Sequence, residues 1–188
     1  MLDAKAIQAA GLGRFSSPFF QAAWVVSDLN AAVERWSRTF GVGPFYVFDH
    51  VQLDGLQYRG NAARLDMSAA LAQAGDLQIE LICQHCDQPS PYRDAFAAGQ
   101  EGFHHLAVFT DEYDRDLASY TDRGFAVVGQ GAVGPMRFAY VDTMPVMGFM
   151  VEVMEDNEPF RDAFRQITEA ARGWDGERPV RGAADLGF

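Results

Sequence analysis

Residues 101–111 read E-G-F-H-H-L-A-V-F-T-D, and this stretch decides the fold. Two histidines open a short apolar run that predicts a strand, and Thr110-Asp111 is typical of the start of a helix. The strand would carry the imidazole of His105 into the protein interior, where a polar ring needs a partner. A lone histidine there would most simply bind a backbone carbonyl group. Three matching polar residues elsewhere in the chain instead favour a functional site.

The pattern around this strand occurs twice in the chain. In each half we predict a strand with a polar residue near its start, an amphipathic helix ended by glycine, and three more strands. The polar residues are Gln21 and His105, and the last strand of each half has a central glutamate, Glu80 or Glu152. Duplication of one β-α-β-β-β unit is the most economical explanation.

We therefore expect an α+β fold made of two βαβββ modules and an added C-terminal helix. The expected segments are an N-terminal arm at 1–18, a first module at 19–83, a linker at 84–101, a second module at 102–155, and a C-terminal helix and tail at 156–188.

Three local expectations concern the edges of these modules. In the first module, a strand over 45–53 is followed by a tight turn at Asp54-Gly55 and a return segment at 56–58. The C-terminal helix has an apolar face containing Phe160 and Ile167, which must pack on the sheet or on a second subunit. The tail beyond this helix is expected to be irregular and docked on the protein.

Composition limits the class of protein. The chain has 188 residues, 48% of them hydrophobic, which suffices for a globular core. It has neither an apolar run of roughly 18 residues nor the layout of a signal peptide, so we expect a cytoplasmic protein with no membrane partner. A net charge of −11 and a single lysine, Lys5, make nucleic acid a poor partner.

The two cysteines lie in the motif C-Q-H-C at 83–86. Two cysteines are too few for a disulfide-built fold, and a redox pair would be expected to open a helix rather than follow a strand. As half of a structural zinc site, the motif lacks a second pair of ligands. We interpret it as structural or incidental, with His85 as the exception.

Glu80 and Glu152 each lie in the middle of an apolar strand, where a carboxylate must be paired, protonated or bound to a metal. If the two sheets lie side by side, both can converge with Gln21 and His105 on one concave surface. Three oxygen ligands and one imidazole suit a divalent ion such as Zn²⁺, Ni²⁺, Co²⁺ or Mn²⁺, with positions open for water or substrate. We therefore predict a metal site formed by Gln21, Glu80, His105 and Glu152.

Strand alternation gives the two adjacent histidines different roles. It places Phe103, Ala107 and Phe109 on the face of His105, and it turns His104 toward the helix-covered face. We therefore interpret His104 as structural. The site then lacks the two histidines and one carboxylate of non-haem iron oxygenases, unless His104 or His50 also turns inward.

From about residue 19 to residue 155, the chain resembles the glyoxalase or vicinal-oxygen-chelate superfamily. G-D-L-Q-I-E-L at 75–81, S-P-Y-R-D-A-F at 90–96 and E-G-F-H-H-L-A at 101–107 resemble its methylmalonyl-CoA epimerase branch. The resemblance implies paired, curved mixed sheets and a metal held by Gln21, Glu80, His105 and Glu152. The epimerase-like pattern has histidine where this chain has Gln21, and the set Gln, Glu, His, Glu resembles animal-type glyoxalase I.

Such a site favours removal of a proton beside a carbonyl group, through a metal-stabilised enediolate, by an isomerase, epimerase or glyoxalase-like lyase. Glu152 is the expected base and Asp66 a weaker second candidate. The resemblance implies a small carbonyl or thioester substrate. The alternatives are a ring-cleaving dioxygenase of the same fold and a non-enzymatic binding protein of the bleomycin-resistance type. The C-terminal helix and the apolar composition lead us to expect a homodimer.

Overall fold

The computed structural model describes residues 18–187, so the N-terminal arm expected at 1–18 lies almost wholly outside the described residues. The strands are β1 (Gln21–Val25), β2 (Phe45–Phe48), β3 (Asp54–Tyr58), β4 (Asn61–Ala62), β5 (Met67–Ala74), β6 (Leu77–Gln84), β7 (Gly102–Thr110), β8 (Val127–Val133), β9 (Met136–Val141), β10 (Met150–Glu155) and β11 (Val180–Gly182). The helices are α2 (Leu29–Phe40), α3 (Pro91–Ala95), α4 (Tyr113–Thr121), α5 (Met144–Met147), α6 (Glu158–Ala171) and the 3-10 helix η1 (Ala183–Leu186).

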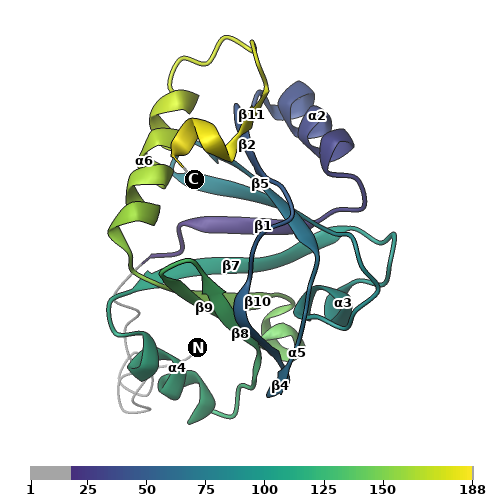
Figure 1. Cartoon of the computed structure of the whole chain (residues 1–188), viewed down its shortest axis with the longest axis vertical. Coiled ribbons are helices and arrows are strands. Elements are labelled where there is room, and N and C mark those ends of the chain that lie inside the picture. The colour runs from purple at the N-terminus through teal and green to yellow at the C-terminus, as the bar shows by residue number, and fades with distance from the viewer. Residues whose placement is uncertain (1–17, 188) are drawn as a thin grey trace, which may run out of the picture.

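The described strands form one mixed sheet in the order β11-β2-β5-β6-β1-β7-β10-β9-β8-β3-β4. The order β2-β5-β6-β1 in the first half is mirrored by β7-β10-β9-β8 in the second. In both halves the first strand pairs in parallel with the last, and the halves meet where β1 and β7 pair antiparallel. This arrangement confirms the predicted α+β fold of two βαβββ modules (Figure 1).

One long helix covers the outer face of each half. Helix α2 begins after Asp28, whose side chain accepts a hydrogen bond from the amide of Ala31, and it ends at Gly41, which has a left-handed φ of 66°. Its Ala32 and Val33 pack on the apolar residues of β5 and β6, while α4 covers β9 and β10 in the second half. In the described part of the chain, the opposite face of the sheet carries no such helix over its centre, and it forms the concave inner surface on which the predicted site lies.

The return segment expected at 56–58 does not pair with the strand that precedes it, so this prediction is wrong. Strand β3 crosses to the other half and pairs antiparallel with β8, for example Gln57 with Gln130. The reason is that β2 already has a neighbour on each side, β5 and β11. Segment β3–β4 therefore extends the sheet at the edge of the second half.

The C-terminal segment is more regular than expected. Residues 180–182, expected to be irregular, form β11 and pair in parallel with β2. Helix α6 packs on the sheet rather than leaving its apolar face for a partner, since Ile167 is fully buried with Tyr46, Leu71 and Leu186. This helix therefore gives no support to the expected homodimer.

The segment expected as a linker, 84–101, contains the short helix α3. Ser90 caps it by accepting a hydrogen bond from the amide of Arg93, and Tyr92 of the helix is buried. At the end of the segment 84–101, the carboxylate of Glu101 accepts hydrogen bonds from Ser27 and Arg35. Within residues 18–187, none of the helices combines the length and apolar character that a membrane crossing demands.

The packing of α6 can be tested with Ile167→Ala. We expect the free energy of unfolding to fall by about 2–5 kcal/mol, because the substitution leaves a cavity between α6 and the sheet. Chemical denaturation would measure it. Glu169→Ala, at an exposed position of the same helix, is the control and should change the value by less than about 0.5 kcal/mol. Equal effects of the two substitutions would contradict this packing.

Candidate metal centre

The strand register brings the four predicted ligands together in two equivalent rows. Across the sheet, Ala23 of β1 lies between Glu80 of β6 and His105 of β7. In the next row, Ala107 of β7 lies between Gln21 of β1 and Glu152 of β10. Each alanine is fully buried and small, so the longer side chains on either side can reach over it.

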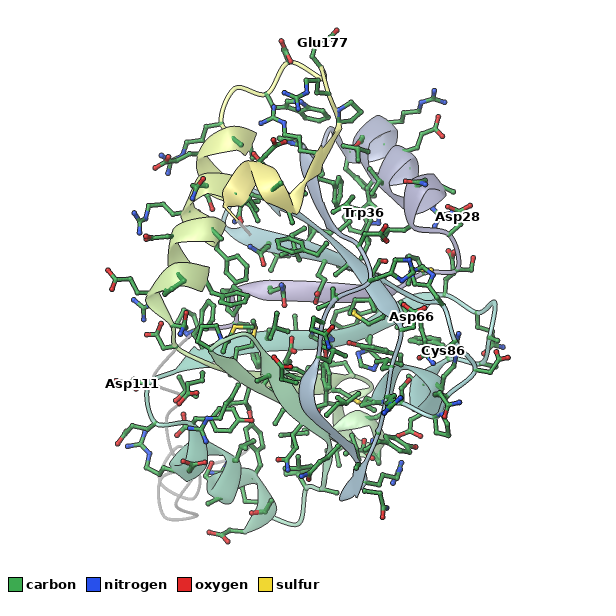
Figure 2. The ribbon with its side chains drawn as sticks, viewed as in Figure 1. Asp28, Trp36, Asp66, Cys86, Asp111 and Glu177 are labelled. Atoms are coloured by element: carbon green, nitrogen blue, oxygen red, sulfur yellow. The ribbon has the colours of Figure 1, made fainter. Side chains whose placement is uncertain are left out.

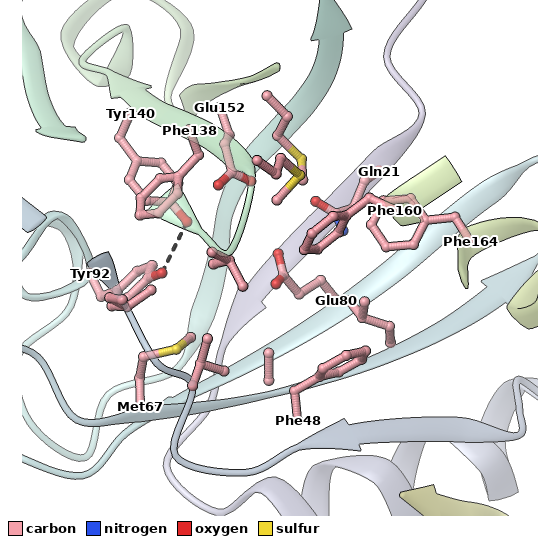
Figure 3. A pocket seen from close by; sticks show the side chains of 17 residues that line it. Gln21, Phe48, Met67, Glu80, Tyr92, Phe138, Tyr140, Glu152, Phe160 and Phe164 are labelled. Carbon is pink, nitrogen blue, oxygen red and sulfur yellow. Dashed lines mark hydrogen bonds between the residues drawn. The ribbon is translucent and has the colours of Figure 1, made fainter. Parts of the chain in front are cut away.

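The side chains converge as this register implies. His105 Nε2 lies 3.3 Å from Glu80 Oε2 and 3.1 Å from Glu152 Oε2. A ligand atom from each of these three residues lies within 4.8 Å of the others. Gln21 is only 2% exposed, and it lines the same pocket as the two glutamates (Figure 3).

Three buried atoms at this point lack a well-formed hydrogen bond: Gln21 Oε1, Glu80 Oε2 and His105 Nε2. The last two meet only as the ion pair described above. The Gln21 amide nitrogen donates to Gln78, at 2.7 Å, which leaves its oxygen free. Buried polar atoms without partners are costly and rare. Their convergence fits a bound divalent ion, which oxygen and imidazole ligands of this kind can hold.

The electrostatics at this point also favour a cation. Burial raises the pKa of Glu80, although the neighbouring His105 lowers it. Burial alone would lower the pKa of His105, but Glu152 and Glu80 raise it to about 9. The His105 imidazolium therefore balances carboxylate charge inside the protein. A metal ion would take the place of that proton.

His104 does not turn away from His105, so the expected alternation is wrong at this residue. The register between β1 and β7 shifts between Ala23 and Trp24, so that Ala23 pairs with His105 and Trp24 with Phe103. His104 is the extra residue of this β-bulge, and its ring lies 5.2 Å from that of His105. Phe103, expected on the face of His105, instead packs against Trp24 on the helix-covered face.

His104 fixes the orientation of His105. Its Nε2 lies 3.1 Å from the carbonyl oxygen of Pro91, which can only accept, so this nitrogen carries the proton. Its Nδ1 then accepts from His105 Nδ1, at 2.9 Å. Burial, together with His105, lowers the pKa of His104 to about 3, which keeps it neutral. His105 Nε2 is left facing the carboxylates, as a metal ligand requires.

The pocket above the ligands is largely apolar, with a cavity of about 90 Å³. Its walls come from strands of both halves and from α6. They include Met67, Met136, Phe138, Met154, Phe160 and Phe164. None of the arginines in the described part of the chain lines it. Among residues 18–187, the acidic side chains that line the pocket are Glu80 and Glu152.

Two tyrosines of the pocket were not among the predicted site residues. The hydroxyl groups of Tyr92 and Tyr140 lie 2.9 Å apart (Figure 3). Burial and the nearby glutamates raise both pKa values well above the ordinary range, so both hydroxyl groups stay protonated. Alternation of Met136, Phe138 and Tyr140 along β9 could have placed Tyr140 on the inner face. Tyr92 carried no such signal, because it lies in the segment interpreted as a linker.

Asp66, the second candidate base, is not brought to this centre. It precedes β5, its side chain is 48% exposed, and its Oδ1 lies 2.6 Å from His50 Nδ1. It does not line the pocket that holds the four ligands. His50 also stays outside this pocket, so neither His50 nor His104 supplies a second histidine ligand.

Comparisons with known proteins agree with the fold. A family model described as Glyoxalase/Bleomycin resistance protein/Dioxygenase superfamily matches residues 20–140. A search of curated protein sequences found no match.

Several solved structures share the fold. A hypothetical protein from Bacillus halodurans C-125 is 15% identical, with a TM-score of 0.54, over 76% of this chain and 96% of its own. A methylmalonyl-CoA epimerase in complex with methylmalonyl-CoA is 20% identical, with a TM-score of 0.52 and the same coverage. A Streptomyces coelicolor methylmalonyl-CoA epimerase variant in complex with 2-nitronate-propionyl-CoA is 21% identical, again with a TM-score of 0.52, over 76% of this chain and 96% of its own.

The positioning role of His104 can be tested with His104→Phe, which keeps a ring but removes the acceptor for His105. We expect the affinity for Zn²⁺ to fall about 10- to 100-fold, because the ligand loses its orientation. Calorimetric titration would measure it, and a thermal melt would check that the variant folds. His104→Gln, which retains an acceptor, should restore part of the affinity. Unchanged affinity in His104→Phe would show that His104 only fills space.

Proposed function

The chain belongs to the Glyoxalase/Bleomycin resistance protein/Dioxygenase superfamily, and from this premise we propose that it is a divalent-metal-dependent isomerase, epimerase or lyase. The reaction that we propose is removal of a proton beside the carbonyl group of a small substrate. One observation carries the proposal: ligand atoms of Glu80, His105 and Glu152 lie within 4.8 Å of one another, and Gln21, which lines the same pocket as the two glutamates, has a buried oxygen without a hydrogen-bond partner. We name Zn²⁺, Ni²⁺, Co²⁺ or Mn²⁺ as the ion, held by these four residues.

When bound, the ion would act as a Lewis acid that stabilises negative charge developing on the substrate oxygen. The remaining work falls to the side chains. Glu152 lines the pocket that would hold the substrate, which supports its role as the general base that takes the proton. The neutral amide of Gln21 adds an oxygen ligand without adding charge. The protonated hydroxyl groups of Tyr92 and Tyr140 lie at the wall, where one donates to the other and the second can donate its proton to a substrate oxygen.

The pocket also limits the part of the substrate that enters it. Its walls are apolar, and no arginine of the described chain lines it, so apart from the proposed ion at its base a phosphate or carboxylate would find no cationic side chain in these walls. A cavity of about 90 Å³ is smaller than one of roughly 150 Å³ that accepts benzene. We therefore propose that a short, uncharged acyl or carbonyl group enters. A thioester substrate would keep its larger, charged part outside.

The ligand set argues against the dioxygenase alternative. Non-haem iron oxygenases of the common type use two histidines and one carboxylate. Here His105 is the one histidine at the centre, since both ring nitrogens of His104 are engaged by Pro91 and His105. The apolar pocket fits a binding protein as well, so the decisive experiment must detect proton abstraction itself.

Deuterium exchange in D₂O provides that experiment. Metal-loaded protein would be incubated with a panel of short acyl thioesters and α-hydroxy ketones, and loss of the proton beside the carbonyl followed by NMR. We expect exchange that depends on the ion and disappears after treatment with a chelator. If the protein binds these compounds but causes no exchange, the proposed enzyme activity is wrong and the protein sequesters its ligand.

For the substrate that exchanges, Glu152→Gln should reduce the rate about 10²- to 10⁴-fold, because the side chain can no longer accept a proton. Metal content and the melting temperature should change little, since the amide oxygen can remain near the ion. Glu169→Gln, an exposed position on α6, is the matched control and should keep full activity. An unchanged rate in Glu152→Gln would remove this residue from the mechanism.

A further inference from the structure

The histidine of the C-Q-H-C motif acquires the partners that the motif lacked in the sequence. His85 follows β6, and the fold brings it to His50, which follows β2, and to Asp66, which precedes β5. A ligand atom from each of the three lies within 4.8 Å of the others. We propose that His50, Asp66 and His85 form a second divalent-metal site, selective for borderline ions such as Zn²⁺ and separate from the pocket.

The three residues are held together by the backbone as well as by their side chains. Asp66 Oδ1 lies 2.6 Å from His50 Nδ1, and the rings of His50 and His85 lie 5.0 Å apart. The amide of His85 donates to the carbonyl oxygen of Asp66, at 2.8 Å. The strand pairing between β5 and β6 continues into this bond, so the ligands stand on the ordered end of the sheet.

Ser68 orders both histidines from below. It is 1% exposed, and its hydroxyl donates to Asp49, at 2.6 Å. The same oxygen accepts from the backbone amide of His50, at 3.0 Å, and lies 2.8 Å from His85 Nε2. A buried hydroxyl that fixes one ligand's backbone and another's ring is the kind of support that metal sites use.

The donor set specifies the kind of ion. Two imidazoles and one carboxylate suit Zn²⁺ and other first-row ions, Fe²⁺ included, rather than Mg²⁺ or Ca²⁺, which prefer oxygen ligands alone. The side chains of His50 and Asp66 are 64% and 48% exposed, which leaves room for water in the remaining positions. Cys86 lies at the rim, where its Sγ is 3.4 Å from the amide nitrogen of Asp66 (Figure 2).

An ion there would also connect the surface to the pocket. His50 lies in the segment between β2 and β3, and Val51 and Leu53 of that segment line the pocket of the first metal centre. Binding to His50, Asp66 and His85 would tie this segment to β5 and β6. The second ion would thus hold one wall of the substrate pocket in place.

Metal counting on the full-length protein tests the proposal. The chain would be stripped with a chelator, incubated with Zn²⁺, desalted, and measured by elemental analysis. We expect His50→Ala/His85→Ala, and separately Asp66→Asn, to lose one Zn²⁺ per chain relative to the unmodified protein. Asp87→Asn, an exposed acidic neighbour of the motif outside the cluster, is the control and should lose none.

The first metal centre is tested separately by Glu80→Ala/His105→Ala, which removes two of its proposed ligand side chains. If both sites exist, each set of substitutions removes one ion and their combination removes both. If the surface variants fold, as shown by an unchanged melt of the metal-free protein, and retain all of the bound Zn²⁺, the second site is overturned. If zinc is lost only in the surface variants, the second site stands and the proposed metal centre in the pocket falls.

Discussion

The antiparallel pairing of β1 with β7 is the contact on which the rest of the site depends. It places Ala23 opposite His105 and Gln21 opposite Ala107. Each half therefore contributes one polar side chain and one alanine that leaves space beside the polar side chain of the other half. The parallel neighbours of these strands add Glu80 and Glu152 at matching levels. Neither half contains the complete set of proposed ligands. A side chain larger than alanine at position 23 or 107 would fill the space in which these four side chains meet.

The buried polar atoms explain why the surroundings are built as they are. Apolar walls raise the cost of every group that lacks a partner, and the same walls strengthen its attraction for a cation. The need to provide every buried polar atom with a partner extends to His104. This bulge residue decides which nitrogen of His105 faces the pocket. The cluster of His50, Asp66 and His85 differs, because it is exposed to water. Hydrogen bonds around Ser68, rather than burial among apolar side chains, hold its side chains in place.

The duplication was the part of the structure that the sequence could predict, because it leaves a repeated order of strands, helices and polar residues. It led to Gln21, Glu80, His105 and Glu152, which the fold brings together. Local signals also predicted an amphipathic helix ended by glycine, and α2 ends in this way at Gly41. The bulge at His104 left no trace, since it is a property of two paired strands rather than of one. Three further features were not predicted for the same reason, since each depends on contacts between residues distant in the chain. They are the position of Tyr92 in the pocket, the pairing of β3 with β8, and strand β11.

The pairing of β3 with β8 has a consequence for how the chain folds. A duplicated protein could in principle form each half independently, but here a strand from the first half completes the edge of the second. Tyr58 must pair with Gly129, which is distant in the sequence, before that edge is formed. Such contacts raise the mean sequence separation of the native pairings, which slows folding. The two halves should therefore unfold together in a single transition rather than in two steps.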